Sequence, residues 1–195
     1  ISGGAGNDTL LGGEGKASIS AGEQDDDVTG GDGNDTIEGG GGADSISGGD
    51  GDDEIDGGNQ NDTIDAGEGN ETVLGGYGSD EISTGSGNDS VDGGNDSDTI
   101  SAGSGSDTIE GGSGADSIQG GADDDSRDGG NDNDTIRGDQ GDDTFEGGAG
   151  NDSIVGGSGA DSIDGGDHED TVDGGSGADT LSGGATDDIF IIRDG

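Results

Sequence analysis

An acidic side chain recurs every nine residues along almost the whole chain. It is an aspartate in all but two of the 21 copies, the exceptions being Ala17 and Glu71. Carboxylate oxygens are preferred ligands of hard cations such as Ca²⁺, which also accepts backbone carbonyl oxygens. The spacing therefore predicts a row of metal sites. The candidate ligands are Asp8, Asp26, Asp35, Asp44, Asp53, Asp62, Glu71, Asp80, Asp89, Asp98, Asp107, Asp116, Asp125, Asp134, Asp143, Asp152, Asp161, Asp170, Asp179 and Asp188.

The acid belongs to a strict nonapeptide that must position it. Residues 3–191 divide into 21 consecutive copies of glycine, glycine, x, glycine, x, aspartate, x, apolar, x, with no insertion or deletion. Examples are GGAGNDTLL at 3–11, GGDGNDTIE at 30–38 and GGSGADSIQ at 111–119. An apolar residue between polar neighbours predicts a half-buried strand of about three residues. Stacked copies then give two facing parallel sheets, with the aspartate pointing inward where turn meets strand.

The composition leaves few other ways to hold such a chain together. The 195 residues include 53 glycines, 49 acids against 4 bases, one histidine, and no proline, cysteine, methionine or tryptophan. Without cysteines there is no disulfide and no ordinary zinc site. A net charge of −45 argues against direct binding to nucleic acid, and no apolar stretch is long enough for membrane insertion. Stacked carboxylates would repel one another, so we expect folding and cation binding to be one event.

These repeats resemble the repeats-in-toxin (RTX) family of calcium-binding proteins, with haemolysin-type nonapeptides, over 189 of the 195 residues. The resemblance implies an all-β fold, a right-handed parallel β-roll solenoid with two nonapeptides per turn and calcium ions between stacked turns. It also implies that carbonyls of two turns and their position-six aspartates bind each ion. Odd and even repeats form separate ladders, so at most 19 ions fit between the turns.

Two alternatives to calcium coordination are open at this stage. Magnesium is the competing hard cation, but it demands near-octahedral geometry and gives up water reluctantly, which favours calcium. The aspartates could instead only cap turns by accepting hydrogen bonds from backbone amides. Capping alone would not require a carboxylate in nearly every copy.

A second period of 36 residues is visible at position four of the repeat. Glycine is replaced there by Gln24, Gln60, Asp96, Asp132 and His168. One interpretation is that these residues tolerate a left-handed turn within a duplicated unit of four repeats. The other is altered coordination, with side-chain oxygens supplied by the preceding Asn59, Asn95 and Asn131.

Three irregular places carry separate predictions. Ala17 removes a carboxylate beside Lys16, so we expect weak or empty sites next to that turn. Arg127 puts a charge in the apolar ladder, which is costly unless it pairs with an acid such as Asp125 or reaches solvent, and repeat 14 is the expected weak point. The apolar run within 189–195 predicts a partial C-terminal cap that covers the last strand.

The sequence predicts one array over residues 1–195, a piece of a longer secreted polypeptide, without catalytic residues of its own. The leading interpretation, from the resemblance, is a calcium-induced folding module of a bacterial protein exported by type I secretion and located outside the cell or at its surface. The alternative is a mechanical stalk, surface-layer or matrix segment of a large calcium-dependent adhesin. Its partners would be calcium and the rest of that polypeptide, with end-to-end self-association where an edge is uncovered. Ice binding is disfavoured because position three contains no threonine.

Overall fold

The computed structural model describes residues 1–192, which form 22 strands and no helix. No part of this described range forms a helix that could cross a membrane. The strands are β1 (Ser2–Ala5), β2 (Thr9–Glu14), β3 (Ser18–Glu23), β4 (Asp27–Asp32), β5 (Thr36–Gly41), β6 (Ser45–Asp50), β7 (Glu54–Asn59), β8 (Thr63–Glu68), β9 (Thr72–Tyr77), β10 (Glu81–Ser86), β11 (Ser90–Asn95), β12 (Thr99–Ser104), β13 (Thr108–Ser113), β14 (Ser117–Ala122), β15 (Ser126–Asn131), β16 (Thr135–Gln140), β17 (Thr144–Ala149), β18 (Ser153–Ser158), β19 (Ser162–Asp164), β20 (Thr171–Ser176), β21 (Thr180–Ser182) and β22 (Ile189–Ile191).

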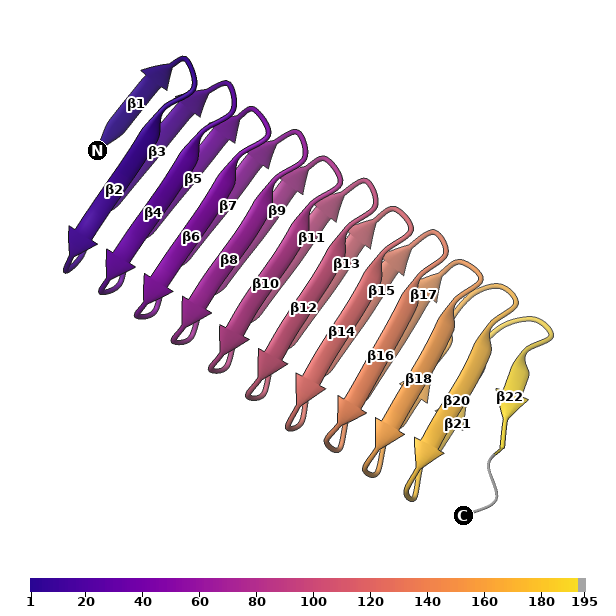
Figure 1. Cartoon of the computed structure of the whole chain (residues 1–195). Helices are drawn as coiled ribbons and strands as arrows, with labels where there is room; N and C mark the ends of the chain where they lie inside the picture. Colours follow the sequence, from indigo (N-terminus) through magenta and orange to yellow (C-terminus); the bar gives the residue numbers. More distant parts are fainter. Residues whose placement is uncertain (193–195) are drawn as a thin grey trace.

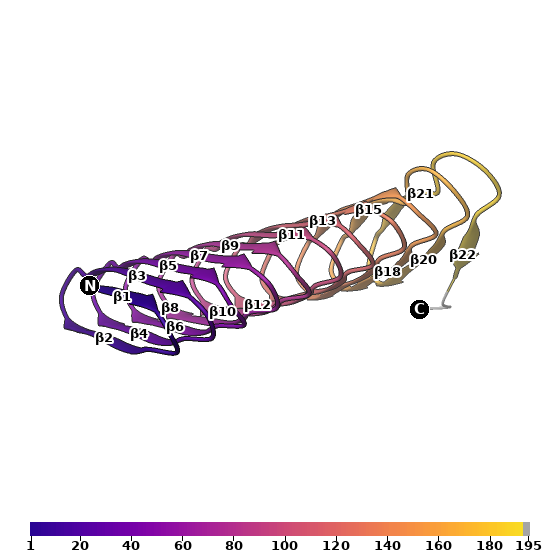
Figure 2. The same cartoon turned by 90° about the horizontal axis from the view of Figure 1, so that it is seen from above.

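Successive strands alternate between two facing sheets. One 11-stranded sheet contains the odd-numbered strands and the other contains the even-numbered strands, each in sequence order (Figure 1). Seen from above, the chain is a coil that advances steadily from the N-terminus to the C-terminus (Figure 2). The prediction of two facing parallel sheets, with two nonapeptides per turn, is confirmed.

Every strand pairs with the strand 18 residues away in the same register. Ile82 lies between Ile64 and Ile100, so like residues stack on like. Pairing continues into the glycine-rich half of the repeat, where Gly85 pairs with Gly103. Most strands are consequently six residues long, and the predicted length of three residues is wrong. Glycine carries no side-chain signal for a strand, yet its backbone still joins the parallel ladder.

The core is the ladder of apolar side chains at position eight, with small residues at position one beside it. Full burial of one such aliphatic side chain is worth about 1.5–3 kcal/mol. Position one is a buried alanine or threonine in four copies, and the Thr84 hydroxyl donates a hydrogen bond to the Ala102 carbonyl at 2.9 Å. The buried position-eight residues are Leu10, Ile19, Val28, Ile37, Ile46, Ile55, Ile64, Val73, Ile82, Val91, Ile100, Ile109, Ile118, Ile136, Phe145, Ile154, Ile163 and Val172, together with Arg127.

The C-terminal strand continues the even sheet but is not buried. Strand β22 pairs with β20, and the exposed fractions of Ile189 and Phe190 are 62% and 42%. Residues 193–195 of the predicted cap lie outside the described residues, so the cap over 189–195 stays a prediction.

Candidate metal centres in the turns

Nearly all position-six carboxylates lie inside the roll, at the junction of turn and strand. Those of the central turns are buried, with exposed fractions of 1–3% for the whole residue. Asp8, Asp179 and Asp188, near the two ends of the stack, are only partly buried. The inward orientation predicted for position six is therefore the observed one. A buried carboxylate needs hydrogen bonds, a proton or a cation to offset its desolvation.

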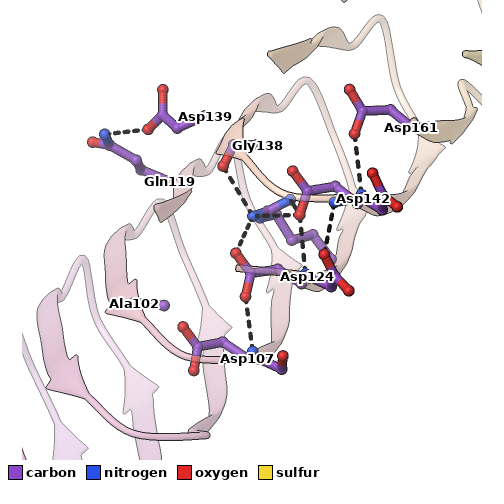
Figure 3. Close-up of polar contacts among 12 residues, drawn as sticks. Ala102, Asp107, Gln119, Asp124, Gly138, Asp139, Asp142 and Asp161 are labelled. Carbon is purple, nitrogen blue, oxygen red and sulfur yellow. Dashed lines mark hydrogen bonds and ion pairs between the residues drawn. The ribbon is translucent and has the colours of Figure 1, made fainter. Parts of the chain in front are cut away.

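One oxygen of nearly every position-six carboxylate accepts a hydrogen bond from a backbone N–H of the neighbouring turn. The N–H of Asp44 donates to Asp62 Oδ1 at 2.8 Å, and the N–H of Asp26 donates to Asp44 Oδ1 at the same distance. The same bond joins Asp107 to the aspartate 18 residues later (Figure 3). The capping alternative is thus partly right, because the carboxylates do accept from backbone amides. The amide lies in the preceding turn of the same ladder, however, and only Oδ1 is used.

The second oxygen is buried and has no hydrogen-bond partner in the described part of the chain. These Oδ2 atoms belong to Asp8, Asp26, Asp35, Asp44, Asp53, Asp62, Asp80, Asp89, Asp98, Asp107, Asp116, Asp134, Asp143, Asp152, Asp161 and Asp170. An unpaired buried carboxylate oxygen is costly, and so many in one protein require an explanation. A row of cations would supply the missing partner.

Burial and like charge make these groups seek protons or cations. Desolvation, reinforced by neighbouring aspartates, raises the pKa of Asp62, Asp98 and Asp134 to about 7. The same causes raise the pKa to about 6 in Asp107, Asp116 and Asp152. The neighbours include carboxylates one turn away, such as Asp44 beside Asp62. A divalent ion placed between turns would relieve both the desolvation and the repulsion.

Backbone carbonyls converge on the same interior space. A Cβ added to Gly30 would lie 2.5 Å from Asp35 Oδ2 and 2.6 Å from the carbonyl oxygen of Gly48, one turn further on. A carboxylate and a carbonyl oxygen thus approach one point from two stacked turns. In residues 1–192 no three acidic, histidine or cysteine side chains gather at one place. A cation held here would therefore be coordinated by few carboxylates together with backbone carbonyls, a donor set that suits Ca²⁺.

The turns in which another residue replaces glycine at position four keep the left-handed backbone of the glycine turns. The φ angles of Gln24, Gln60 and His168 are 77°, 75° and 86°. This supports the interpretation that these residues tolerate the turn. The amide nitrogen of Asn59, proposed as an oxygen donor, instead donates to the Gly40 carbonyl at 3.0 Å. His168 is exposed, and its Nδ1 lies 2.9 Å from the Asp167 carbonyl oxygen.

Glu71, in repeat 8, interrupts the ladder of even repeats in a way that its extra methylene explains. It is buried, but the bond expected from the N–H of Asp53 is missing, and both of its carboxylate oxygens are unpaired within residues 1–192. Its Oε1 is displaced toward Gly69 at position four. Burial, and to a smaller extent the neighbouring carboxylate of Asp89, raises the pKa of Glu71 to about 8. Glu71 therefore occupies the predicted place without the predicted geometry.

Ala17 and Arg127, the other two departures from the repeat pattern at positions six and eight, differ in their hydrogen bonds and ion pairs. Ala17 keeps the ladder bond of its own N–H, to Asp35 Oδ1 at 2.6 Å, although it contributes no oxygen itself. Lys16 is exposed and forms no ion pair within residues 1–192. Arg127 pairs with Asp125, as predicted.

Position five forms a second ladder, which the sequence pattern did not predict. Asn70 Oδ1 accepts from the N–H of Asn88 at 2.9 Å, and Asp124 Oδ1 accepts from the N–H of Asp142 at 2.8 Å (Figure 3). These side chains are exposed. The available signal was the frequency of Asn, Asp and Ser at this position, which are typical turn residues.

These features define a class of protein: a parallel β-solenoid whose turns hold buried carboxylate oxygens beside backbone carbonyl oxygens. Within that class, the model of the RTX calcium-binding nonapeptide repeat (4 copies) matches residues 2–37, 29–64, 65–100, 101–136, 128–163 and 164–191. The chain belongs to this family, which is a structural calcium-binding repeat and not a catalytic fold. No curated protein matches the chain.

Proposed function

We propose that the position-six carboxylates and the turn carbonyls hold calcium ions between turns stacked in the same ladder, up to about 19 between all turns, and that this binding drives folding. The observation that carries the proposal is the row of buried, unpaired Oδ2 atoms. Bound calcium would supply the positive charge and oxygen coordination that these atoms lack. Because the backbone amide of the preceding turn holds the Oδ1 of nearly all these aspartates, the stack itself fixes the orientation of Oδ2.

Without calcium, the stack is opposed by its own charge. The net charge is −45, and buried carboxylates such as Asp62 face like charges one turn away on both sides. A hydrophobic core one side chain thick must offset this repulsion as well as the entropy of ordering a glycine-rich chain. Binding and folding are therefore coupled, as in other proteins whose metal site does not exist in the unfolded chain.

The test is a calcium titration followed by far-ultraviolet circular dichroism, with magnesium at equal ionic strength as the control. We expect a cooperative coil-to-β transition with calcium only. A matched pair of variants locates the effect. Asp98→Asn, in the buried ladder, should raise the calcium midpoint, whereas Asp92→Asn, on the exposed face of β11, should leave it unchanged. A β spectrum already present in chelator would contradict the proposal.

The cellular setting that fits is a secreted bacterial protein. Calcium modules that work outside cells bind with a dissociation constant of roughly 0.1–1 mM. Such sites are empty in cytoplasm, where the chain would stay unfolded for export, and fill outside. Folding at submicromolar calcium would argue against this setting.

A mechanical stalk is the second candidate, and the uninterrupted register of both sheets favours it. At about 4.8 Å per turn, 11 turns give a rod of roughly 50 Å. We expect pulling the two ends apart to require much higher force in calcium than in chelator. Equal forces would exclude a calcium-stiffened stalk.

A further inference from the structure

Arg127 is a cation inside an otherwise apolar ladder. It occupies position eight of repeat 14, in strand β15, where it pairs in register with Ile109 and Phe145 of the adjacent strands. Its exposed fraction is 2%, and its guanidinium carbon lies 4.9 Å from the centre of the Phe145 ring. A guanidinium remains charged at any relevant pH, so a permanent positive charge is buried here.

The guanidinium contacts the turns of repeats 14 and 16. Nη2 donates to Asp125 Oδ2 at 2.5 Å and to the carbonyl oxygen of Gly138 at 3.2 Å, the latter drawn in Figure 3. Nη1 lies 3.4 Å from Asp143 Oδ1, one turn further along the same ladder. Asp125 is consequently the one fully buried position-six aspartate in the described chain whose Oδ2 has a partner.

The same two acceptors recur in the other turns, where they are not bridged by a side chain. At Gly111 an added Cβ would lie 2.6 Å from both Asp116 Oδ2 and the carbonyl oxygen of Gly129. At Gly120 an added Cβ would overlap the guanidinium of Arg127 instead. Arg127 therefore bridges, in repeat 14, the pair of oxygens that elsewhere face each other across stacked turns.

We propose that Arg127 is a resident cation that takes the place of one calcium ion between the turns of repeats 14 and 16. This inference rests on the proposed calcium-driven folding. The junction is closed by a covalently attached charge, so it binds one ion fewer than its neighbours and orders at lower calcium. On this proposal repeat 14 is the point where the roll begins to form, and not its weak point.

The competing explanation is a tolerated substitution. Buried ion pairs can often be replaced by apolar residues with no loss of stability. In that case Arg127→Ile, which restores the commonest residue of the ladder, would change neither the number of ions nor the order of folding. The two explanations therefore differ in measurable quantities.

Native mass spectrometry of the calcium-saturated chain counts bound ions as integers. We expect Arg127→Ile to bind one more calcium than the parent chain. Arg137→Ile is the matched control, because it removes the same charge from an exposed position in β16, the next strand in sequence, which belongs to the opposite sheet. Its ion count should equal that of the parent. An unchanged count in Arg127→Ile would overturn the inference.

Hydrogen exchange during a calcium titration gives a second readout. In the parent, amides of repeats 14–16 should gain protection at the lowest calcium concentration, and Arg127→Ile should abolish this lead. Arg127→Lys, which keeps the charge but cannot bridge two acceptors in the same way, should weaken it. Protection of repeats 14–16 last in the parent would overturn the inference. Failure of the parent chain itself to fold with calcium would instead refute the proposed function.

Discussion

Glu71→Asp repairs the one break in the position-six ladder and should stabilise the calcium-loaded chain. The shorter side chain can accept from the N–H of Asp53, as aspartates do elsewhere in the ladder. A hydrogen bond to a charged group is worth about 1.5–3 kcal/mol. Loss of one buried methylene costs about 0.8 kcal/mol, which leaves a net gain of about 1–2 kcal/mol.

Thermal unfolding in saturating calcium measures this gain. For a chain of this size, each kcal/mol shifts Tm by roughly 2–4 °C, so the expected rise is roughly 2–8 °C. Glu81→Asp makes the same chemical change at an exposed position of β10 and should leave Tm unchanged. A Tm for Glu71→Asp equal to or below that of the parent would refute the reasoning that the extra methylene breaks the ladder.

Three further predictions concern protons, turns and the core. Buried carboxylates with pKa raised to about 6–7 bind protons better in the folded chain than in the unfolded chain, so lowering the pH from 8 to 5 in chelator should increase β structure measured by circular dichroism. In calcium, the same acidification should raise the midpoint, because protons compete with the metal; an opposite trend in either titration would contradict the assignment. Gly42→Ala should destabilise the chain by about 1–3 kcal/mol in calcium-dependent unfolding, because its Cβ would overlap the Gln24 carbonyl at positive φ, whereas Gly41→Ala meets open space and should be neutral. Ile100→Ala, in the core, should cost about 2–5 kcal/mol by chemical denaturation, with exposed Ser101→Ala as the unaffected control.

The fold was largely predictable because one period fixes every register. A repeat of nine residues without insertions aligns each residue with its equivalent 18 residues away, as Ile82 aligns with Ile100. Strand length was not predictable in the same way. The pairing of Gly85 with Gly103 depends on backbone geometry, and glycine has no side chain whose pattern could predict a strand there.

The candidate site was predictable in residue type and burial, but not in the use of each oxygen. Asp62 lies two residues before the apolar Ile64, so the alternation of side chains along a strand predicts that it points into the roll. Its bond to the N–H of Asp44 depends instead on the direction in which the carboxylate is oriented along the stack. Asp125 could be named as a partner of Arg127 because it lies two residues away. Asp143 and Phe145 became neighbours of Arg127 only through stacking of successive turns.

The two side-chain ladders in the turns run in opposite directions. At position six, the carboxylate of Asp62 serves the amide of Asp44, which precedes it by one turn. At position five, the side chain of Asn70 serves the amide of Asn88, which follows it by one turn. Damage at the two positions should therefore spread asymmetrically, with loss of a position-six acid loosening the turn before it and loss of a position-five amide loosening the turn after it. The hydrogen bonds thus give the rod a direction: each turn is held by position-six side chains of the turn after it and by position-five side chains of the turn before it.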